Sequence, residues 1–250
     1  MKTKSIYLLL AVVIFIASSC GKNSGKGTVN LKMVPEASGN PVQFKTAVYT
    51  DNDEDVRYRV DNFQFYISNI KFIKDDNTEV VFSKADDVKL FLWKEYINDQ
   101  EEFKIPSGDY SKIVFTLGLT PDINATEPGD YNTDKPLGAN SGNYWLMSNS
   151  YIYSKFEGFI DTSNTMGATL DNSFLFHIGG DGFSKEITII KDFTISRDES
   201  TELPISIEFN KFWNGPSTLD LKTELQTHTL NKPDLATRFL NNFASSFSAE

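Results

Sequence analysis

Apolar and polar residues alternate with a period of two along most of the chain, as expected for strands that bury one face. The clearest run is Thr28–Val34, in which Val29, Leu31 and Met33 share one side. Similar runs occur at 42–48, 63–67, 70–72, 88–92, 113–117, 187–189, 193–195 and 203–209. Turn-forming clusters at 75–77, 106–109 and 179–182 separate several of them. This pattern is typical of an all-β sandwich or barrel, and we expect an antiparallel two-sheet β-sandwich with long loops.

The C-terminal segment follows a different period. After Pro233, apolar residues recur at every fourth position, at Leu235, Phe239, Phe243 and Phe247. Proline is well suited to the first turn of a helix. The segment is therefore predicted to form an amphipathic helix that covers the sheet or one of its open ends.

The remaining organisation is that of one domain with long loops. No internal repeat or linker divides residues 29–250, so a single domain is predicted there. The largest loop spans 120–143 and is rich in Pro, Gly, Asn and Asp, and a second irregular stretch spans 161–172. Long loops are where a β scaffold usually carries function.

The N-terminus is typical of a bacterial lipoprotein. Lys2 and Lys4 precede an apolar run that is too short for a membrane-spanning helix, and small residues lead to Cys20. We expect residues 1–19 to be a signal peptide and residues 20–28 to be an acylated Cys20 and a flexible tether. The protein would then be anchored in the cell envelope, with the periplasmic side of the outer membrane favoured. The alternative is an ordinary secretory signal with an incidental cysteine.

Composition removes several classes of function. The net charge of −10 disfavours nucleic acid as a partner. Two His and one Cys leave few groups for nucleophilic chemistry, and no GxSxG, HExxH, CxxC or phosphate-binding glycine motif occurs. We therefore expect no enzymatic activity and no organic cofactor. The one enzymatic alternative is a hydrolase that uses two carboxylates as its catalytic groups. The acidic stretch 51–55 lacks the Gly and Glu that a calcium loop requires.

The two histidines are the best candidates for a metal site. His177 lies in a strand that runs into a glycine turn, and His228 lies just before the predicted helix. Two imidazoles with a soft or aromatic third donor would suit copper. Each could equally be a structural histidine, since sequence spacing does not show whether they meet.

Five segments in collinear order carry a resemblance to a known family. They are YISNIKFIKDD (66–76), PSGDYSKIVFTLGLTPDIN (106–124), NYWLMSNSYIYSKFEG (143–158), FHIGG (176–180) and HTLNKPDLATRFLNNFASSF (228–247). The chain resembles the MbnP-like proteins, periplasmic or surface copper-binding proteins first associated with methanobactin operons. The resemblance implies a β-sandwich that binds copper through His and a Trp oxidised to kynurenine. It also implies a partner, a di-haem enzyme of the MbnH type, which performs that oxidation.

Carried over residue by residue, the resemblance assigns Trp145, His177 and His228 to the copper site. Met147 stands where the family often has a second Trp. Its thioether would be a soft ligand suited to Cu(I), or it could mark a member that has lost the site.

The sequence thus favours a lipid-anchored copper-binding protein that acts in copper acquisition or buffering. The alternative is an envelope module without metal that binds a glycan or a protein. In that case the 120–143 loop would act with the neighbouring aromatic residues Tyr144, Trp145, Tyr151 and Tyr153. Exposure of these four rings would favour the alternative, and their burial would count against it.

Overall fold

The computed structural model describes residues 25–51, 56–84, 87–94, 96–161, 163, 169–220 and 223–249. The predicted signal peptide, Cys20, most of the acidic stretch 51–55 and much of the irregular stretch 161–172 lie outside these ranges. Within the described residues, no helix has the length and apolar character needed to cross a bilayer.

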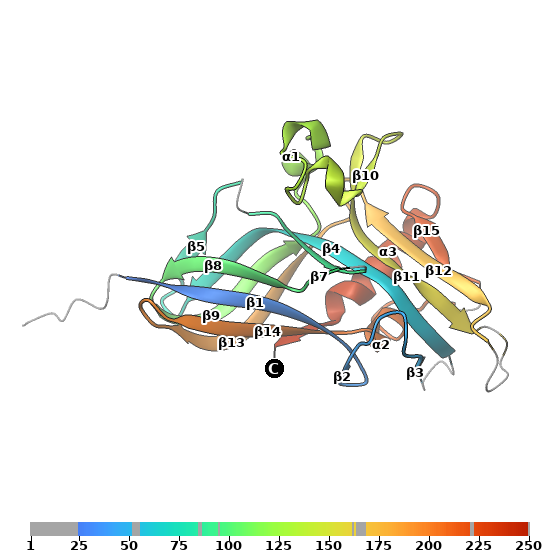
Figure 1. Cartoon of the computed structure of the whole chain (residues 1–250), viewed down its shortest axis with the longest axis horizontal. Helices are drawn as coiled ribbons and strands as arrows, with labels where there is room; N and C mark the ends of the chain where they lie inside the picture. The colour runs from blue at the N-terminus through green and yellow to red at the C-terminus, as the bar shows by residue number, and fades with distance from the viewer. Residues whose placement is uncertain are drawn as a thin grey trace, which may run out of the picture.

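Two sheets form the body of the protein (Figure 1). The smaller sheet contains β1 (Lys26–Ala37), β2 (Asn40–Pro41), β8 (Gln100–Pro106), β14 (Ser200–Glu208) and β16 (Phe247–Ala249). The long strands of the larger sheet are β13 (Lys185–Ile195), β9 (Gly108–Leu117), β4 (Val56–Lys74), β11 (Ser150–Asp161) and β12 (Asn172–Gly179). Its short strands are β3 (Tyr49–Asp51), β5 (Glu79–Val81), β6 (Lys89–Trp93), β7 (Ile97–Asn98), β10 (Tyr144–Trp145) and β15 (Gln226–His228). The predicted all-β sandwich is confirmed.

The strand directions correct one part of that prediction. Most pairs are antiparallel, but β1 runs parallel to β14 and β12 runs parallel to β15. Both sheets are therefore mixed. Alternation of apolar and polar residues shows which face of a strand is buried and carries no information on its direction. Parallel partners need long connections, and both of these pairs join segments far apart in the chain.

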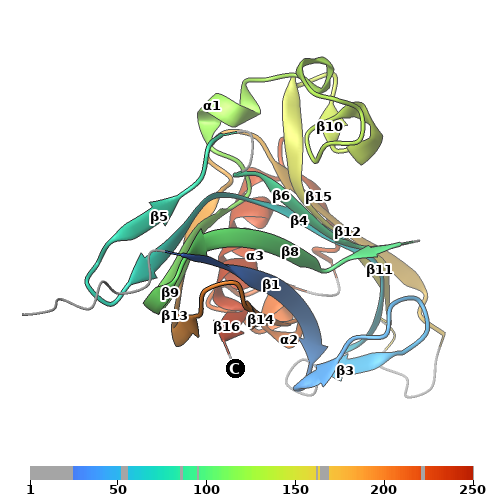
Figure 2. The same cartoon turned by 60° about the vertical axis from the view of Figure 1, so that its left-hand side comes forward.

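Aromatic rings fill the space between the sheets. On β4, Phe63 and Phe65 are fully buried, and their ring centres lie 5.6 Å and 5.4 Å from that of Phe243. Phe243 belongs to α3 (Pro233–Ser245), which lies with α2 (Asn210–Trp213) against the inner face of the larger sheet, beside the smaller sheet (Figure 2). The predicted C-terminal helix is thus present. It ends at Ser245, so Phe247 belongs to β16 and stacks on Phe243 from there.

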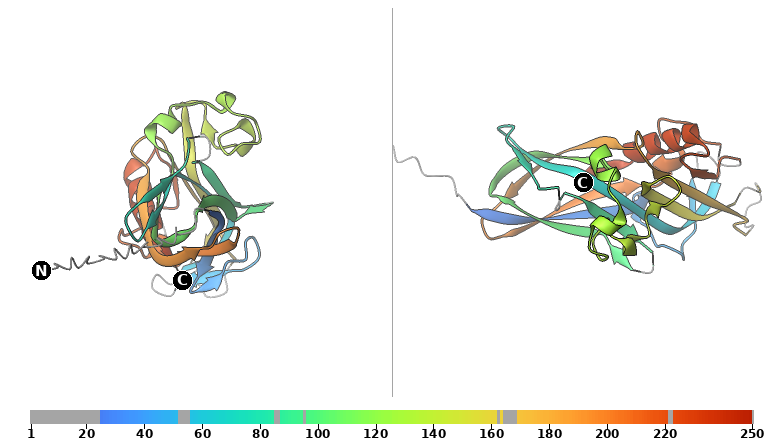
Figure 3. Two further views of the ribbon diagram at one scale, coloured as in Figure 1. Left: turned by 90° about the vertical axis from the view of Figure 1, so that its left-hand side faces the viewer. Right: turned by 90° about the horizontal axis from the view of Figure 1, so that it is seen from above.

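The 120–143 loop stands on the outer face of the larger sheet (Figure 3). It contains α1 (Pro121–Asn124) and two short 3-10 helices, Pro128–Asp130 and Ala139–Ser141. Beneath it lies a second, smaller apolar cluster, whose buried members include Tyr66, Leu119, Ile123, Leu137, Tyr151 and Tyr153. The larger sheet is therefore covered on both faces at this point.

Candidate functional site

A row of polar side chains crosses the outer face of the larger sheet. Gln64 on β4 pairs with Lys155 on β11, Lys155 pairs with His177 on β12, and His177 pairs with His228 on β15. Neighbouring residues on the same strands, such as Phe65 and Phe176, are buried on the inner face. Because side chains alternate along a strand, the four polar residues point to the opposite, outer side.

The two imidazoles lie side by side. Their ring centres are 4.9 Å apart and the rings meet edge to face at 82°. The side chain of His177 is only 13% exposed, whereas His228 is exposed at the edge of the sheet. Partial desolvation at the sheet surface and the charge of neighbouring His177 lower the pKa of His228, so its neutral form persists to more acidic pH than in an unperturbed imidazole.

A carboxylate completes the surroundings of His177. Its Nε2 lies 2.6 Å from Oε1 of Glu157, which is also on β11. This hydrogen bond is the largest of several effects that lower the pKa of Glu157. An ionised carboxylate can only accept a hydrogen bond, so the contact favours a proton on His177 Nε2.

Trp145 lies beside His228. The centre of its ring system is 6.5 Å from that of the imidazole. The indole packs over the backbone of Gly179, since a Cβ atom at that glycine would lie 3.1 Å from its Cζ3 atom. The structure thus brings together three of the four metal-ligand candidates predicted from the sequence. The fourth, Met147, lies in the turn after β10 with its side chain fully exposed, so no imidazole packs against it.

The tyrosines predicted as a ligand-binding platform are mostly covered. Tyr151 is fully buried and donates a hydrogen bond to the Leu137 carbonyl at 3.0 Å. Tyr153 is 3% exposed. Tyr144 is half-buried, with its ring centre 4.9 Å from that of Tyr151. Only Tyr144 and Trp145 keep partly accessible rings, which leaves little aromatic surface for a glycan.

Asn124 of α1 holds the Trp145 hairpin and the glycine turn in place. Its Oδ1 accepts hydrogen bonds from Tyr151 N at 3.0 Å and from Ser150 Oγ at 3.2 Å. Its Nδ2 donates to Asp181 at 3.0 Å. The loop therefore fixes the start of β11 relative to the turn that follows β12.

Side chains hold the three-residue strand β15 at the sheet edge. Thr229 Oγ1 accepts a hydrogen bond from Gly179 N at 2.9 Å and donates one to the His177 carbonyl at 3.2 Å. Thr227 Oγ1 donates to the Lys232 carbonyl at the start of α3, also at 3.2 Å. His228 thus lies between two threonines whose hydroxyls are both engaged.

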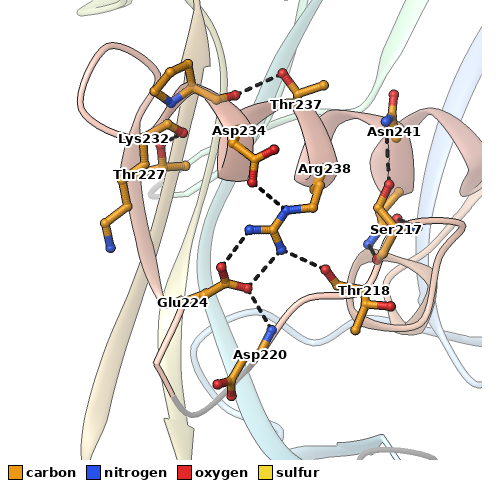
Figure 4. A network of polar contacts seen from close by, with 12 residues as sticks. Ser217, Thr218, Asp220, Glu224, Thr227, Lys232, Asp234, Thr237, Arg238 and Asn241 are labelled. Carbon is orange, nitrogen blue, oxygen red and sulfur yellow. Dashed lines mark hydrogen bonds and ion pairs between the residues drawn. The ribbon is translucent and has the colours of Figure 1, made fainter.

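Arg238 on α3 anchors the segment that leads into β15 (Figure 4). Its guanidinium donates two hydrogen bonds to Glu224, at 2.6 Å and 2.9 Å, and others to Asp234 and the Thr218 carbonyl. This contact lowers the pKa of Glu224 to about 2. The clamp ties the connection before His228 to the C-terminal helix.

The sequence analysis did not identify Glu157, Thr229 or Arg238. Glu157 and Lys155 alternate with buried Phe156, which is enough to place Glu157 on the outer face. Its contact with His177 depends on the register between β11 and β12, which the alternation does not encode.

The donor set fits a metal ion held by nitrogen. Among the described residues, no three His, Cys, Asp or Glu side chains converge in a metal-binding geometry. The pair His177 and His228 remains, and ring centres 4.9 Å apart allow both imidazoles to reach one ion through metal–nitrogen bonds of about 2.0–2.1 Å. Imidazole suits copper, zinc, iron and nickel. Further coordination positions would be open to Trp145 or to a ligand from outside the chain.

The fold and this site define a class of protein, a two-sheet β-sandwich with paired imidazoles on the outer face of one sheet. The chain belongs to the MbnP family, whose family model matches residues 26–234. The resemblance inferred from the five sequence segments is thereby confirmed.

A solved structure shares the fold. It is MbnP from Methylosinus trichosporium, with a TM-score of 0.56 and 12% sequence identity over 81% of this chain and 82% of that chain. No curated protein sequence matches the chain. The family match ends in the first turn of α3, so Arg238 lies beyond it.

Proposed function

We propose that this protein is a lipid-anchored, non-enzymatic copper-binding protein of the cell envelope that acts in copper acquisition or buffering. The observation that carries the proposal is the direct pairing of His177 with His228, with the Trp145 indole beside them. Copper forms the most stable divalent complexes of the first-row metals with such nitrogen donors.

Each residue has a defined part in the proposed site. His177 and His228 supply imidazole nitrogens, and Trp145 lies where it could complete the site, unmodified or oxidised. A bound copper ion would add a redox-active centre. The chain's own groups would orient that ion and limit access to it on the His177 side, where the ring is largely buried.

Copper titration of the mature chain from residue 20, purified in detergent, tests the proposal. We expect one equivalent to bind, and we expect His177→Ala and His228→Ala each to weaken binding strongly. Gln226→Ala is the matched control, because Gln226 is exposed on β15 two residues from His228 and should leave affinity unchanged. Stoichiometric binding that survives both histidine substitutions would overturn the assignment.

The anchor and the partner are tested separately. Metabolic labelling with a fatty acid should modify the wild-type protein, and Cys20→Ser should release it into the soluble fraction.

For the partner, we propose a di-haem enzyme of the MbnH type that oxidises Trp145, which is only half-buried on its hairpin. Intact-mass analysis of protein made with and without such an enzyme should show the small mass increase of a Trp-to-kynurenine conversion, which adds one oxygen atom and removes one carbon atom as formate, and Trp145→Phe should abolish it.

A further inference from the structure

A neutral imidazole can bind a metal only through the nitrogen that carries no proton. Which nitrogen that is depends on the hydrogen bond made by the other one. The two histidines of this site differ in this respect. His177 has a carboxylate partner at Nε2, while no hydrogen bond joins a ring nitrogen of His228 to another residue in the described part of the chain.

Glu157 is well placed to fix the proton on His177. The Nε2–Oε1 distance of 2.6 Å is that of a strong, charge-assisted hydrogen bond. The carboxylate is itself enclosed, because Glu157 lies between β4 and β12, paired with Asn62 and Leu175. Both members of the contact are largely shielded, with side-chain exposures of 13% for His177 and 31% for Glu157.

We propose that Glu157 is a positioning residue that holds His177 as its Nε2–H tautomer and thereby leaves Nδ1 as the copper ligand. The inference rests on the proposed function and extends it from the identity of the ligand to the ligand atom. Glu157 itself contacts the Nε2 side of the ring, away from the nitrogen that it leaves unprotonated. Carboxylate–histidine–metal arrangements of this kind fix ring orientation and increase the basicity of the ligand nitrogen.

The tautomer can be measured without metal. Long-range proton–nitrogen correlation spectra of the ¹⁵N-labelled, metal-free chain at pH 9 distinguish Nε2–H from Nδ1–H for each histidine. We expect His177 to be almost entirely Nε2–H and His228 to be a mixture. In Glu157→Gln, which keeps the shape but removes the charge, His177 should also become a mixture. Asp61→Asn is the matched control, since it removes a carboxylate on β4 that pairs with Arg59 and should leave His177 unchanged.

Copper provides the second readout. Glu157→Gln should lower copper affinity by about 10- to 100-fold, the usual effect of losing such a partner. Electron spin-echo spectra of the Cu(II)-loaded protein should also change in the signal of the uncoordinated imidazole nitrogen. Neither readout should move in Asp61→Asn.

The outcomes separate this inference from the proposed function. An Nδ1–H tautomer at His177 in the wild type, or an unchanged tautomer and affinity in Glu157→Gln, would overturn the role of Glu157 while copper binding could stand. The expected tautomer in a chain that binds no copper would instead overturn the proposed function and the assignment of Nδ1 as a ligand. If Glu157→Gln does not fold, the wild-type spectrum still shows whether His177 is the Nε2–H or the Nδ1–H tautomer.

Discussion

The two strands that carry the imidazoles are held by different means. β12 has eight residues and pairs along most of its length with β11, and His177 is fixed further by Glu157. β15 has three residues and lies at the sheet edge, paired only with β12 in the described structure. Besides this short pairing, two threonine hydroxyl groups and the Arg238 clamp hold β15 in position.

One imidazole therefore lies on a strand in the interior of the sheet, and the other lies on a short strand at its edge. The backbone pairing of β12 with β11 places His177. The residues around His177 can therefore change little without loss of the fold. His228 is placed by a pairing of only three residues with β12, together with a few side-chain contacts that can be removed singly. We therefore expect variants on the β15 side to alter copper binding while the sheet stays folded.

The largest expected effect comes from Gly179, at the end of β12. A Cβ atom there would lie 2.2 Å from the Tyr151 carbonyl oxygen and 2.9 Å from Ile152 Cα, so backbone must move. Gly179→Ala should destabilise the protein by about 3 kcal/mol, measured by urea unfolding. Gly129→Ala is the control, because its Cβ would meet nothing within 4 Å. Equal stability of the two variants would show that the backbone at the end of β12 adjusts freely, which would contradict a rigid support for His177.

Thr229 tests the attachment of β15 directly. Thr229→Val keeps the shape but removes the hydroxyl that accepts from the buried Gly179 N–H. An unpaired buried donor costs about 1–3 kcal/mol, and displacement of His228 should weaken copper binding by about tenfold. Thr229→Ser should behave as the wild type. A loss of stability with unchanged copper affinity would show that His228 does not depend on this contact.

Acid should release the Arg238 clamp. The pKa of Glu224 is lowered to about 2 in the folded protein, so the unfolded chain takes up the proton first as the pH falls. Stability from this group is therefore complete above about pH 5 and is lost towards pH 2, by about 1 kcal/mol after allowance for solvent screening. Thermal unfolding of wild type and Glu224→Gln between pH 6 and pH 2.5 measures the difference. If the stability of the two proteins changed with pH in the same way, the ion pair between Glu224 and Arg238 would make no contribution in this pH range.

The smallest effect is expected at Met147. Its side chain is fully exposed, so Met147→Ser should change neither stability nor Cu(I) affinity by a measurable amount. Competition with a chromophoric Cu(I) chelator measures the affinity. A tenfold loss would show that the hairpin turn folds over the imidazoles when copper binds.

The sequence predicted the elements of this fold better than their arrangement. Alternation at Val29, Leu31 and Met33 correctly marked a buried strand face, and the four-residue period after Pro233 correctly marked α3. Neither pattern shows that β1 runs parallel to β14, because direction depends on partners chosen late in the chain.

The site was predictable only in part, for the same reason. The residue types of His177 and His228 suggested a metal site, and the resemblance to the family added Trp145. Their contact depends on the parallel register of β12 with a strand of only three residues. Short polar strands carry almost no periodic signal, and the contact between Glu157 and His177 crosses strands diagonally.

The central place of β1 in the smaller sheet has a consequence for how the protein reaches its native state. The amide of Asn30 donates a hydrogen bond to Ser200, 170 residues later in the chain. The first strand to leave the ribosome therefore has no parallel partner until almost the whole polypeptide has been made. Contacts of such long range slow folding, so the smaller sheet closes late, after most of the other strands have been made.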